Sequence, residues 1–293
     1  MRVWFAPVAV MMMLSVSAST GFVLTVIDDD TENVAAVERV HAVAAAEGVR
    51  VTFAALGRNL DREKELGATL RRYQAEGHEI ASHGYAHSPS LWKSAAFNRQ
   101  AIVEDIERAE KTLQREGFSP KAFVYPYGRF APAALRSRML ETVGGHYALA
   151  FDARGELNRN GRTCPLYVAR HPLRKYDSSF MTRRLIDDAA DRGGWLVLLT
   201  HSGQRLFDPE LLREAIAYAK ERGAKVLPAT AAFAELLKRG WRFEADAAGH
   251  DHSRLDELYD QVYIHAPLVL TALGLCLIAA LSFGWYVVRR FRA

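Results

Sequence analysis

Short apolar runs alternate along the chain with longer segments in which apolar residues recur at helical spacing. The runs that predict strands cover residues 21–27, 49–56, 78–83, 121–128, 147–151, 166–170, 195–201 and 224–229. The segments that predict helices cover residues 32–48, 60–76, 103–117, 132–144, 179–194, 208–223 and 230–240. Repeated strand-then-helix units predict parallel strands covered by helices. About seven such units favour an α/β fold of the distorted (β/α) barrel type, spanning residues 21–240.

The two ends of the chain carry apolar segments that are typical of membrane-directed sequences rather than of strands or amphipathic helices. Residues 1–20 combine a charged start, a short apolar core and small residues, which is typical of a secretory signal peptide or an N-terminal anchor. Residues 266–288 carry no charge and are long enough to cross a bilayer as one transmembrane helix. They follow a polar juxtamembrane connector, 241–265, and precede a basic tail, 289–293, which favours the cytoplasmic side. We therefore expect a membrane-anchored protein with an extracytoplasmic body, periplasmic or extracellular, and a cytoplasmic C-terminus.

Composition is that of a globular protein, with 49% hydrophobic and 25% charged residues among 293 and a net charge of +4. Lysines and arginines are scattered through the predicted helices and form no basic stripe interleaved with aromatic residues. We therefore expect no nucleic acid among the partners. The two cysteines, Cys164 in a polar loop and Cys276 in the C-terminal apolar run, imply no disulfide framework.

Three consecutive aspartates, Asp28, Asp29 and Asp30, end the first predicted strand. Like charges this close raise each other's pKa and oppose folding unless a cation lies among them. The aspartates could help to hold a metal ion. Alternatively, Asp28-Asp29-Asp30-Thr31 reads as D-x-D-x-T, the nucleophile signature of haloacid-dehalogenase-type phosphatases, which use magnesium.

Two histidines follow the strand predicted at 78–83. His83 and His87, in "SHGYAH", are four residues apart, so on one helical turn their imidazoles point the same way. Two imidazoles and a carboxylate suit zinc with an open position for water. Together with the strand-end aspartates, this pair predicts a metal site.

Two further strand ends carry candidate chemistry. In "FVYPYG", Pro126 stiffens the turn and Gly128 makes it permissive, so that it can present a backbone N–H to a ligand. The apolar run "LVLLTH" ends at His201. A histidine at the same rim as a metal site suits the role of general acid.

In this order, the segments resemble the polysaccharide deacetylase family, also called the NodB homology domain or carbohydrate esterase family 4. That family carries an Asp-Asp pair after its first strand, H-[ST]-x-x-H, an R-P-P-Y or Y-P-Y-G turn, and a late L-x-H. The matching segments here are Ile27-Asp28-Asp29, His83-Gly84-Tyr85-Ala86-His87, Tyr125-Pro126-Tyr127-Gly128 and Leu199-Thr200-His201. The resemblance covers residues 21–240.

The resemblance implies a metal-dependent hydrolase that removes N-acetyl or similar acyl groups from a glycan. It implies that Asp29, His83 and His87 hold a divalent metal, most simply Zn²⁺, with Co²⁺, Ni²⁺ or Mn²⁺ as alternatives. Such a metal polarises the amide carbonyl and supplies a water of lowered pKa. The outward-facing body and the predicted tether imply an envelope, extracellular or lipid-linked glycan as substrate.

The resemblance also implies catalytic roles. Asp28 would be the general base, His201 the general acid, and the backbone N–H of Tyr127 would bind the oxyanion. The rest of the turn would contact substrate, namely Tyr125, Pro126 and Gly128.

Three positions depart from the family pattern. Asp30 stands where a glycine is usual, Gly84 where serine or threonine is common, and Val124 where the R-P-P-Y version has its arginine. That arginine pairs with the base, and Arg170 in "LYVARHPL" is expected to take its place. These departures leave the substrate open.

Two alternatives compete with the deacetylase interpretation. A phosphatase would use Asp28 as nucleophile and Asp30 as acid, but it leaves His83 and His87 unexplained. It also needs a late acidic pair that the chain does not offer after the strand at 224–229. An inactive carbohydrate-binding barrel is disfavoured by the intact set of aspartates and histidines.

Overall fold

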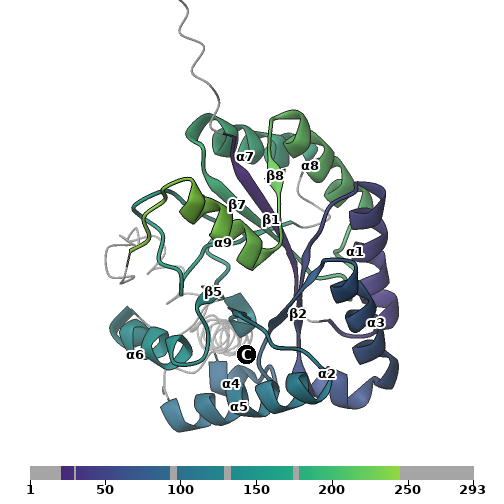
Figure 1. Cartoon of the computed structure of the whole chain (residues 1–293), viewed down its shortest axis with the longest axis vertical. Helices are drawn as coiled ribbons and strands as arrows, with labels where there is room; N and C mark the ends of the chain where they lie inside the picture. Colours follow the sequence, from purple (N-terminus) through teal and green to yellow (C-terminus); the bar gives the residue numbers. More distant parts are fainter. Residues whose placement is uncertain (1–20, 30, 93–97, 129–132, 174–177, 245–293) are drawn as a thin grey trace, which may run out of the picture. The chain divides into compact units, whose positions relative to one another are not determined.

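The computed structural model describes residues 21–29, 31–92, 98–128, 133–173 and 178–244 (Figure 1). Its strands are β1 (Val23–Asp28), β2 (Thr52–Ala55), β3 (Glu79–Ser82), β4 (Ala122–Val124), β5 (Leu149–Phe151), β6 (His171–Pro172), β7 (Trp195–Thr200) and β8 (Lys225–Val226). Its helices are α1 (Val34–Ala46), α2 (Gly57–Arg62), α3 (Lys64–Ala75), α4 (Pro89–Trp92), α5 (Arg99–Arg115), α6 (Ala133–Gly144), α7 (Ser179–Arg192), α8 (Pro209–Glu221) and α9 (Ala229–Lys238).

The strands form one curled sheet in the order β5-β4-β3-β2-β1-β7-β6, and β8 also pairs with β1 (Figure 1). All the strand pairs are parallel. The segment leading into β6 contacts both sides of the curl, because Val168 bridges to Phe151 at the end of β5 while His171 pairs with Leu198 of β7. This arrangement agrees with the predicted distorted (β/α) barrel.

The side chains of β1 alternate between two cores, as expected for a strand. Leu24 and Val26 pack in an outer core with the helices that cover the sheet. Val23 and Ile27 pack in an inner core formed mainly by the other strands. The strand is buried on both faces, which explains why its sequence is almost continuously apolar.

Helix α9 covers the N-terminal end of the strands. Its first amide, Ala229 N, donates to Thr52 Oγ1 at 2.9 Å, and Thr230 N donates to Glu79 Oε2 at 2.8 Å. Thr52 and Glu79 are the first residues of β2 and β3. The carboxyl end of the barrel is therefore the end left for a site.

The structure refines the predicted elements in three places. The helix predicted at 60–76 is two helices, α2 and α3, because Glu63 between them has an extended backbone. The strand predicted at 166–170 pairs only through Val168, and β6 itself begins at His171. Helix α4 was not predicted from the sequence.

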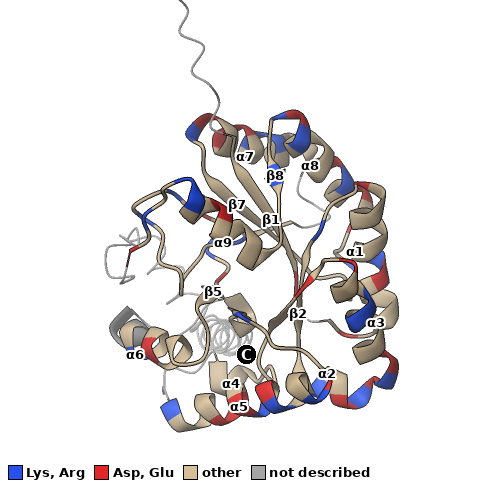
Figure 2. Cartoon of the chain, viewed as in Figure 1, with Lys and Arg blue, Asp and Glu red and all other residues tan. Residues whose placement is uncertain are grey.

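Charged side chains lie mostly on the helices, with both signs interspersed, whereas the strands carry few (Figure 2). The charged residues at the strand ends are therefore exceptional. No helix in the described ranges is long and apolar enough to span a membrane. The predicted signal or anchor at 1–20, the membrane helix at 266–288 and the tail at 289–293 lie outside the described residues.

Candidate active site

The predicted site residues lie at the carboxyl ends of neighbouring strands. Asp28 ends β1 and Asp29 follows it, His83 follows β3, Tyr125 follows β4, and His201 follows β7. These strands run in parallel and belong to one sheet. The residues therefore share the end of the barrel at which such folds place their chemistry. Asp30 lies outside the described residues.

The Asp28 carboxylate is fully buried. It accepts hydrogen bonds from Thr200 and Ser202, which are the two neighbours of His201 in the sequence. Its Oδ1 accepts hydrogen bonds from Thr200 Oγ1 at 2.9 Å and from the Ser202 backbone N–H at 2.8 Å, and its Oδ2 accepts from Ser202 Oγ at 2.6 Å. Burial raises the pKa of Asp28 to about 7, although these hydrogen bonds oppose the rise. Asp28 thus fixes the chain on either side of His201 and is partly ionised near neutral pH.

Asp29 points away from the partners of Asp28. Its Oδ1 accepts from Arg170 Nη1 at 2.5 Å, and its Oδ2 lies 3.9 Å from His201 Nε2. The expected pairing of Arg170 with Asp28 is therefore wrong in this structure. Consecutive residues of a strand face opposite sides, so only one of the two aspartates can meet Arg170.

His83 is oriented by a backbone carbonyl. Its Nδ1 lies 2.7 Å from Val124 O, and the residue is almost fully buried. A carbonyl only accepts, so Nδ1 carries the ring proton and Nε2 keeps its lone pair. Histidines that bind metals are held in this way by a second hydrogen bond. His83 therefore fits the role of a metal ligand.

His87 lies between His83 and the Tyr-Pro-Tyr-Gly turn. Its ring centroid is 5.0 Å from that of His83 and 4.2 Å from that of Tyr127. Tyr127 Oη also donates to His87 O at 2.9 Å. His87 and Tyr127 both have left-handed backbones, with φ of 46° and 65°. Such conformations cost non-glycine residues of order 1–3 kcal/mol and cluster at functional sites.

The turn itself is built into the core. Tyr125 is fully buried, and its hydroxyl donates to Leu166 O at 2.9 Å. The ring faces the interior, so the substrate contact predicted for Tyr125 is not one that its buried side chain can make. Pro126 and Gly128 are buried too, and a Cβ on Gly128 would lie 2.2 Å from the Cβ of Ala153. These residues shape the turn that presents Tyr127.

The sequence did not predict a buried ion pair that lies next to this site. Asp152 follows β5, is fully buried, and has its Oδ2 2.5 Å from Arg154 Nε. Burial raises the pKa of Asp152 to about 6, although the Arg154 charge opposes the rise. The backbone oxygen of Asp152 accepts from Arg170 Nε at 2.7 Å, so the main chain at Asp152 helps to hold Arg170. An aspartate directly after the apolar run 147–151 was the available signal, the same one that identified Asp28.

The described residues contain one triad of ligand-type side chains whose ligand atoms all lie within 4.8 Å of one another, His41, Glu76 and His78. It lies at the end of β3 opposite His83. His78 Nδ1 accepts a hydrogen bond from Val51 N at 3.2 Å, so the ring proton of neutral His78 is on Nε2. While that bond is made, neither ring nitrogen of His78 offers a lone pair to a metal.

The predicted metal ligands Asp29, His83 and His87 are not as close together as that triad in the described structure. Their chemistry nevertheless fits a divalent metal better. Both sets offer a carboxylate and two imidazoles, but His83 has the tautomer that a ligand requires, whereas His78 does not.

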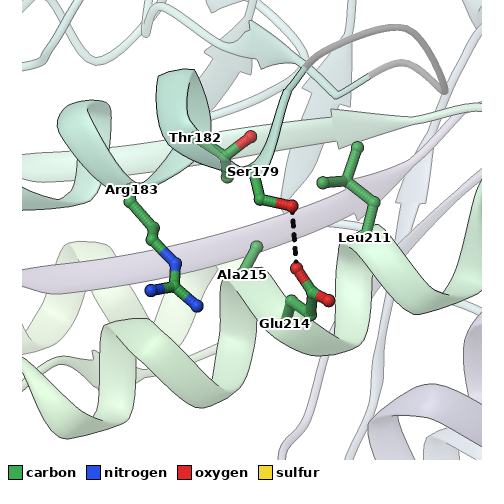
Figure 3. Close-up of a pocket in the computed structure, with 6 residues that line it drawn as sticks. All are labelled: Ser179, Thr182, Arg183, Leu211, Glu214 and Ala215. Atoms are coloured by element: carbon green, nitrogen blue, oxygen red, sulfur yellow. Dashed lines mark hydrogen bonds between the residues drawn. The ribbon is translucent and has the colours of Figure 1, made fainter.

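A small cleft lies between α7 and α8, and none of the predicted site residues lines it (Figure 3). Its lining residues are Ser179, Thr182, Arg183, Leu211, Glu214 and Ala215. Ser179 Oγ donates to Glu214 Oε2 at 2.9 Å across it. The cleft encloses about 10 Å³, room for no more than one water molecule, so it is not a glycan site.

Comparison with known proteins agrees with the motifs. The sequence profile described as polysaccharide deacetylase matches residues 17–140. A chitin deacetylase from Colletotrichum lindemuthianum is 37% identical over 82 residues, which are 27% of this chain and 32% of that protein. The chain thus matches only about a third of the length of this curated relative.

Solved structures share the fold. A family 4 acetyl xylan esterase from Clostridium thermocellum, in complex with a cobalt ion, superposes with a TM-score of 0.52 at 19% identity, over 78% of this chain and 95% of that one. A CE4 esterase from Streptococcus mutans superposes with a TM-score of 0.54 at 17% identity, over 72% and 87%. At these identities the likeness concerns the fold alone.

Proposed function

We propose that this chain, a member of the polysaccharide deacetylase family, is a metal-dependent hydrolase that removes N-acetyl groups from a glycan. The observation that carries the proposal is the setting of His83. Its Nδ1 faces Val124 O, so Nε2 is the ring nitrogen that would bind a metal, at the barrel end that also holds Asp29 and His201. The phosphatase alternative gives this histidine no role.

Asp29, His83 and His87 would hold the metal, most simply Zn²⁺. When bound, the metal supplies a Lewis acid for the acyl carbonyl and lowers the pKa of a water molecule. Arg170 pairs with Asp29 and balances the negative charge of that carboxylate in a buried setting.

Asp28 serves as the general base. Its pKa of about 7 suits a group that accepts a proton near neutral pH. Ser202 Oγ donates to Asp28 Oδ2 at 2.6 Å, and a carboxylate oxygen keeps a second lone pair that could accept the proton of a water molecule.

His201 serves as the general acid and gives its proton to the departing amine. About a third of its side chain is exposed, so it can reach a bound sugar, whereas Asp28 and Asp29 are buried. The Asp29 Oδ2 lies 3.9 Å from His201 Nε2, so His201 stands beside the carboxylate that would hold the metal. The Tyr127 backbone N–H assists at the oxyanion, in the turn that Tyr125, Pro126 and Gly128 shape.

The substrate we propose is an N-acetylated glycan of the envelope or extracellular space, or one linked to a lipid. The apolar segment 266–288 supports this choice, because a tether to the bilayer favours a substrate held close to it. A chain shortened after residue 262 should keep its activity on soluble N-acetylated oligosaccharides and lose activity on membrane-embedded glycan. Equal activity of both forms on the embedded glycan would contradict the tether's role.

The activity itself is tested by acetate release from N-acetylated oligosaccharides by the Zn²⁺-loaded protein. We expect release by the wild type and a loss of about 10²-fold or more in kcat for Asp28→Asn, the usual contribution of a general base. The metal content of Asp28→Asn should stay at the wild-type level. Release of phosphate from a phosphate ester with Mg²⁺, and no release of acetate, would overturn the proposal.

A further inference from the structure

A carboxylate from a distant helix holds the loop between the two histidines. Asp105 on α5 is buried, and its Oδ2 accepts from the Tyr85 backbone N–H at 3.0 Å. Its Oδ1 accepts from the Ala86 backbone N–H at 2.9 Å. Tyr85 and Ala86 are two of the three residues that separate His83 from His87. One side chain thus binds both amide groups at the centre of the His-x-x-x-His segment.

The same contact accounts for Gly84. A Cβ at this position would lie 2.7 Å from Asp105 Oδ2, closer than real Cβ contacts come. Gly84 also has a φ of 75°, which favours glycine. Serine or threonine here would collide with the carboxylate, so Gly84 and Asp105 belong to one arrangement.

The carbonyl groups of the loop are held from the other side by α2. Gly57 N donates to Gly84 O at 3.0 Å, and Arg58 N donates to Tyr85 O at 3.1 Å. Arg58 Nη1 donates to Ala86 O at 2.7 Å. The backbone between the histidines is therefore hydrogen-bonded through its N–H groups to Asp105 and through its carbonyl groups to the start of α2.

We propose that Asp105 is a positioning residue that sets the separation and orientation of His83 and His87 for metal binding. The inference rests on the proposed function, because it assigns a purpose to a histidine pair that binds metal. Asp105 acts through the backbone of Tyr85 and Ala86, which lie between the two histidines. Hydrogen-bonding partners that orient metal ligands typically contribute 10- to 100-fold to metal affinity.

The test compares Zn²⁺ affinity, measured by competition with a chromophoric chelator, in the full-length wild type and three variants. Asp105→Asn keeps the shape of the side chain but turns an NH₂ group toward one of the two amides. Asp105→Ala removes both acceptors. Glu107→Gln removes one charge from an exposed position of the same helix and is the matched control.

We expect Zn²⁺ affinity to fall about tenfold or more in Asp105→Asn and further in Asp105→Ala, with no change in Glu107→Gln. Hydrogen exchange of the Tyr85 and Ala86 amides in the metal-free protein should accelerate in both Asp105 variants. If the wild type binds Zn²⁺ and the folded Asp105→Asn variant binds it equally well, the positioning role is overturned while the proposed function stands. A wild type that binds no Zn²⁺ would overturn both.

Discussion

Asp28 and Ser202 are joined by two hydrogen bonds, one from the Ser202 backbone N–H at 2.8 Å and one from its hydroxyl at 2.6 Å. Asp28 ends β1, whereas Ser202 lies just beyond β7. The residue between Ser202 and the end of β7 is His201. The contact therefore ties the proposed general base to the loop that carries the proposed general acid.

Replacing Ser202 with alanine should destabilise the fold. The change leaves Asp28 Oδ2, in a fully buried carboxylate, without its hydroxyl donor. Hydrogen bonds to charged groups contribute about 1.5–3 kcal/mol, so we expect the free energy of unfolding to fall by about that much. Urea denaturation of Ser202→Ala measures it, with the exposed Ser90→Ala as control. Equal stability of both variants would show that the hydroxyl does not hold Asp28.

Replacing only one partner of the Asp29–Arg170 ion pair should lower the stability of the fold. Arg170 is fully buried and Asp29 nearly so, and removing one partner leaves the other charge uncompensated. For Arg170→Met we expect a loss of about 3–5 kcal/mol in the free energy of unfolding. The double variant Arg170→Met with Asp29→Asn should lose less than Arg170→Met alone. A double variant that is less stable than the single one would contradict the pairing.

His78, in the triad with His41 and Glu76, should contribute to the pH dependence of stability. Burial, with a smaller contribution from the charge of His41, lowers the pKa of His78 from 6.5 to about 4. As the pH falls below about 6.5, the unfolded chain gains a proton that folded His78 does not bind. The contribution of His78 to stability is therefore present above that pH and is lost progressively down to about pH 4.

His78→Asn tests this expectation, because asparagine keeps an acceptor for the Val51 N–H and does not titrate. Between pH 7 and 4 the free energy of unfolding should fall less in the variant than in the wild type. Asp28 and Asp152, whose pKa values are raised, act with the opposite sign and are common to both proteins. Parallel pH profiles would mean that His78 titrates normally in the folded state.

The sequence was most informative about features that depend on a single strand, namely its burial and the polar residues at its end. The apolar run of β1 and the aspartates after it predicted both a buried strand and a charged strand end, because each depends on local pattern alone. The same holds for His83 after β3 and His201 after β7. The barrel followed from counting strand-then-helix units.

Pairings across the fold could not be predicted in this way. Arg170 meets Asp29 rather than Asp28 because of the face that each aspartate presents at the end of β1. Asp105 lies in an amphipathic helix, where nothing in the sequence distinguishes it from the other polar residues. Its contact with the His83–His87 loop depends on how α5 packs beside β3. The burial of Tyr125 likewise depends on the core that surrounds β4.

The most direct test of this account is the metal content of the purified protein, compared with its His83→Ala and His87→Ala variants. We predict about one Zn²⁺ per chain in the wild type and none in either variant, with all three folded, as expected for a single site of two histidines and a carboxylate. Circular dichroism establishes that the variants are folded. A wild type without metal, or metal retained in both variants, would contradict the site at His83 and His87 and with it the proposed deacetylase.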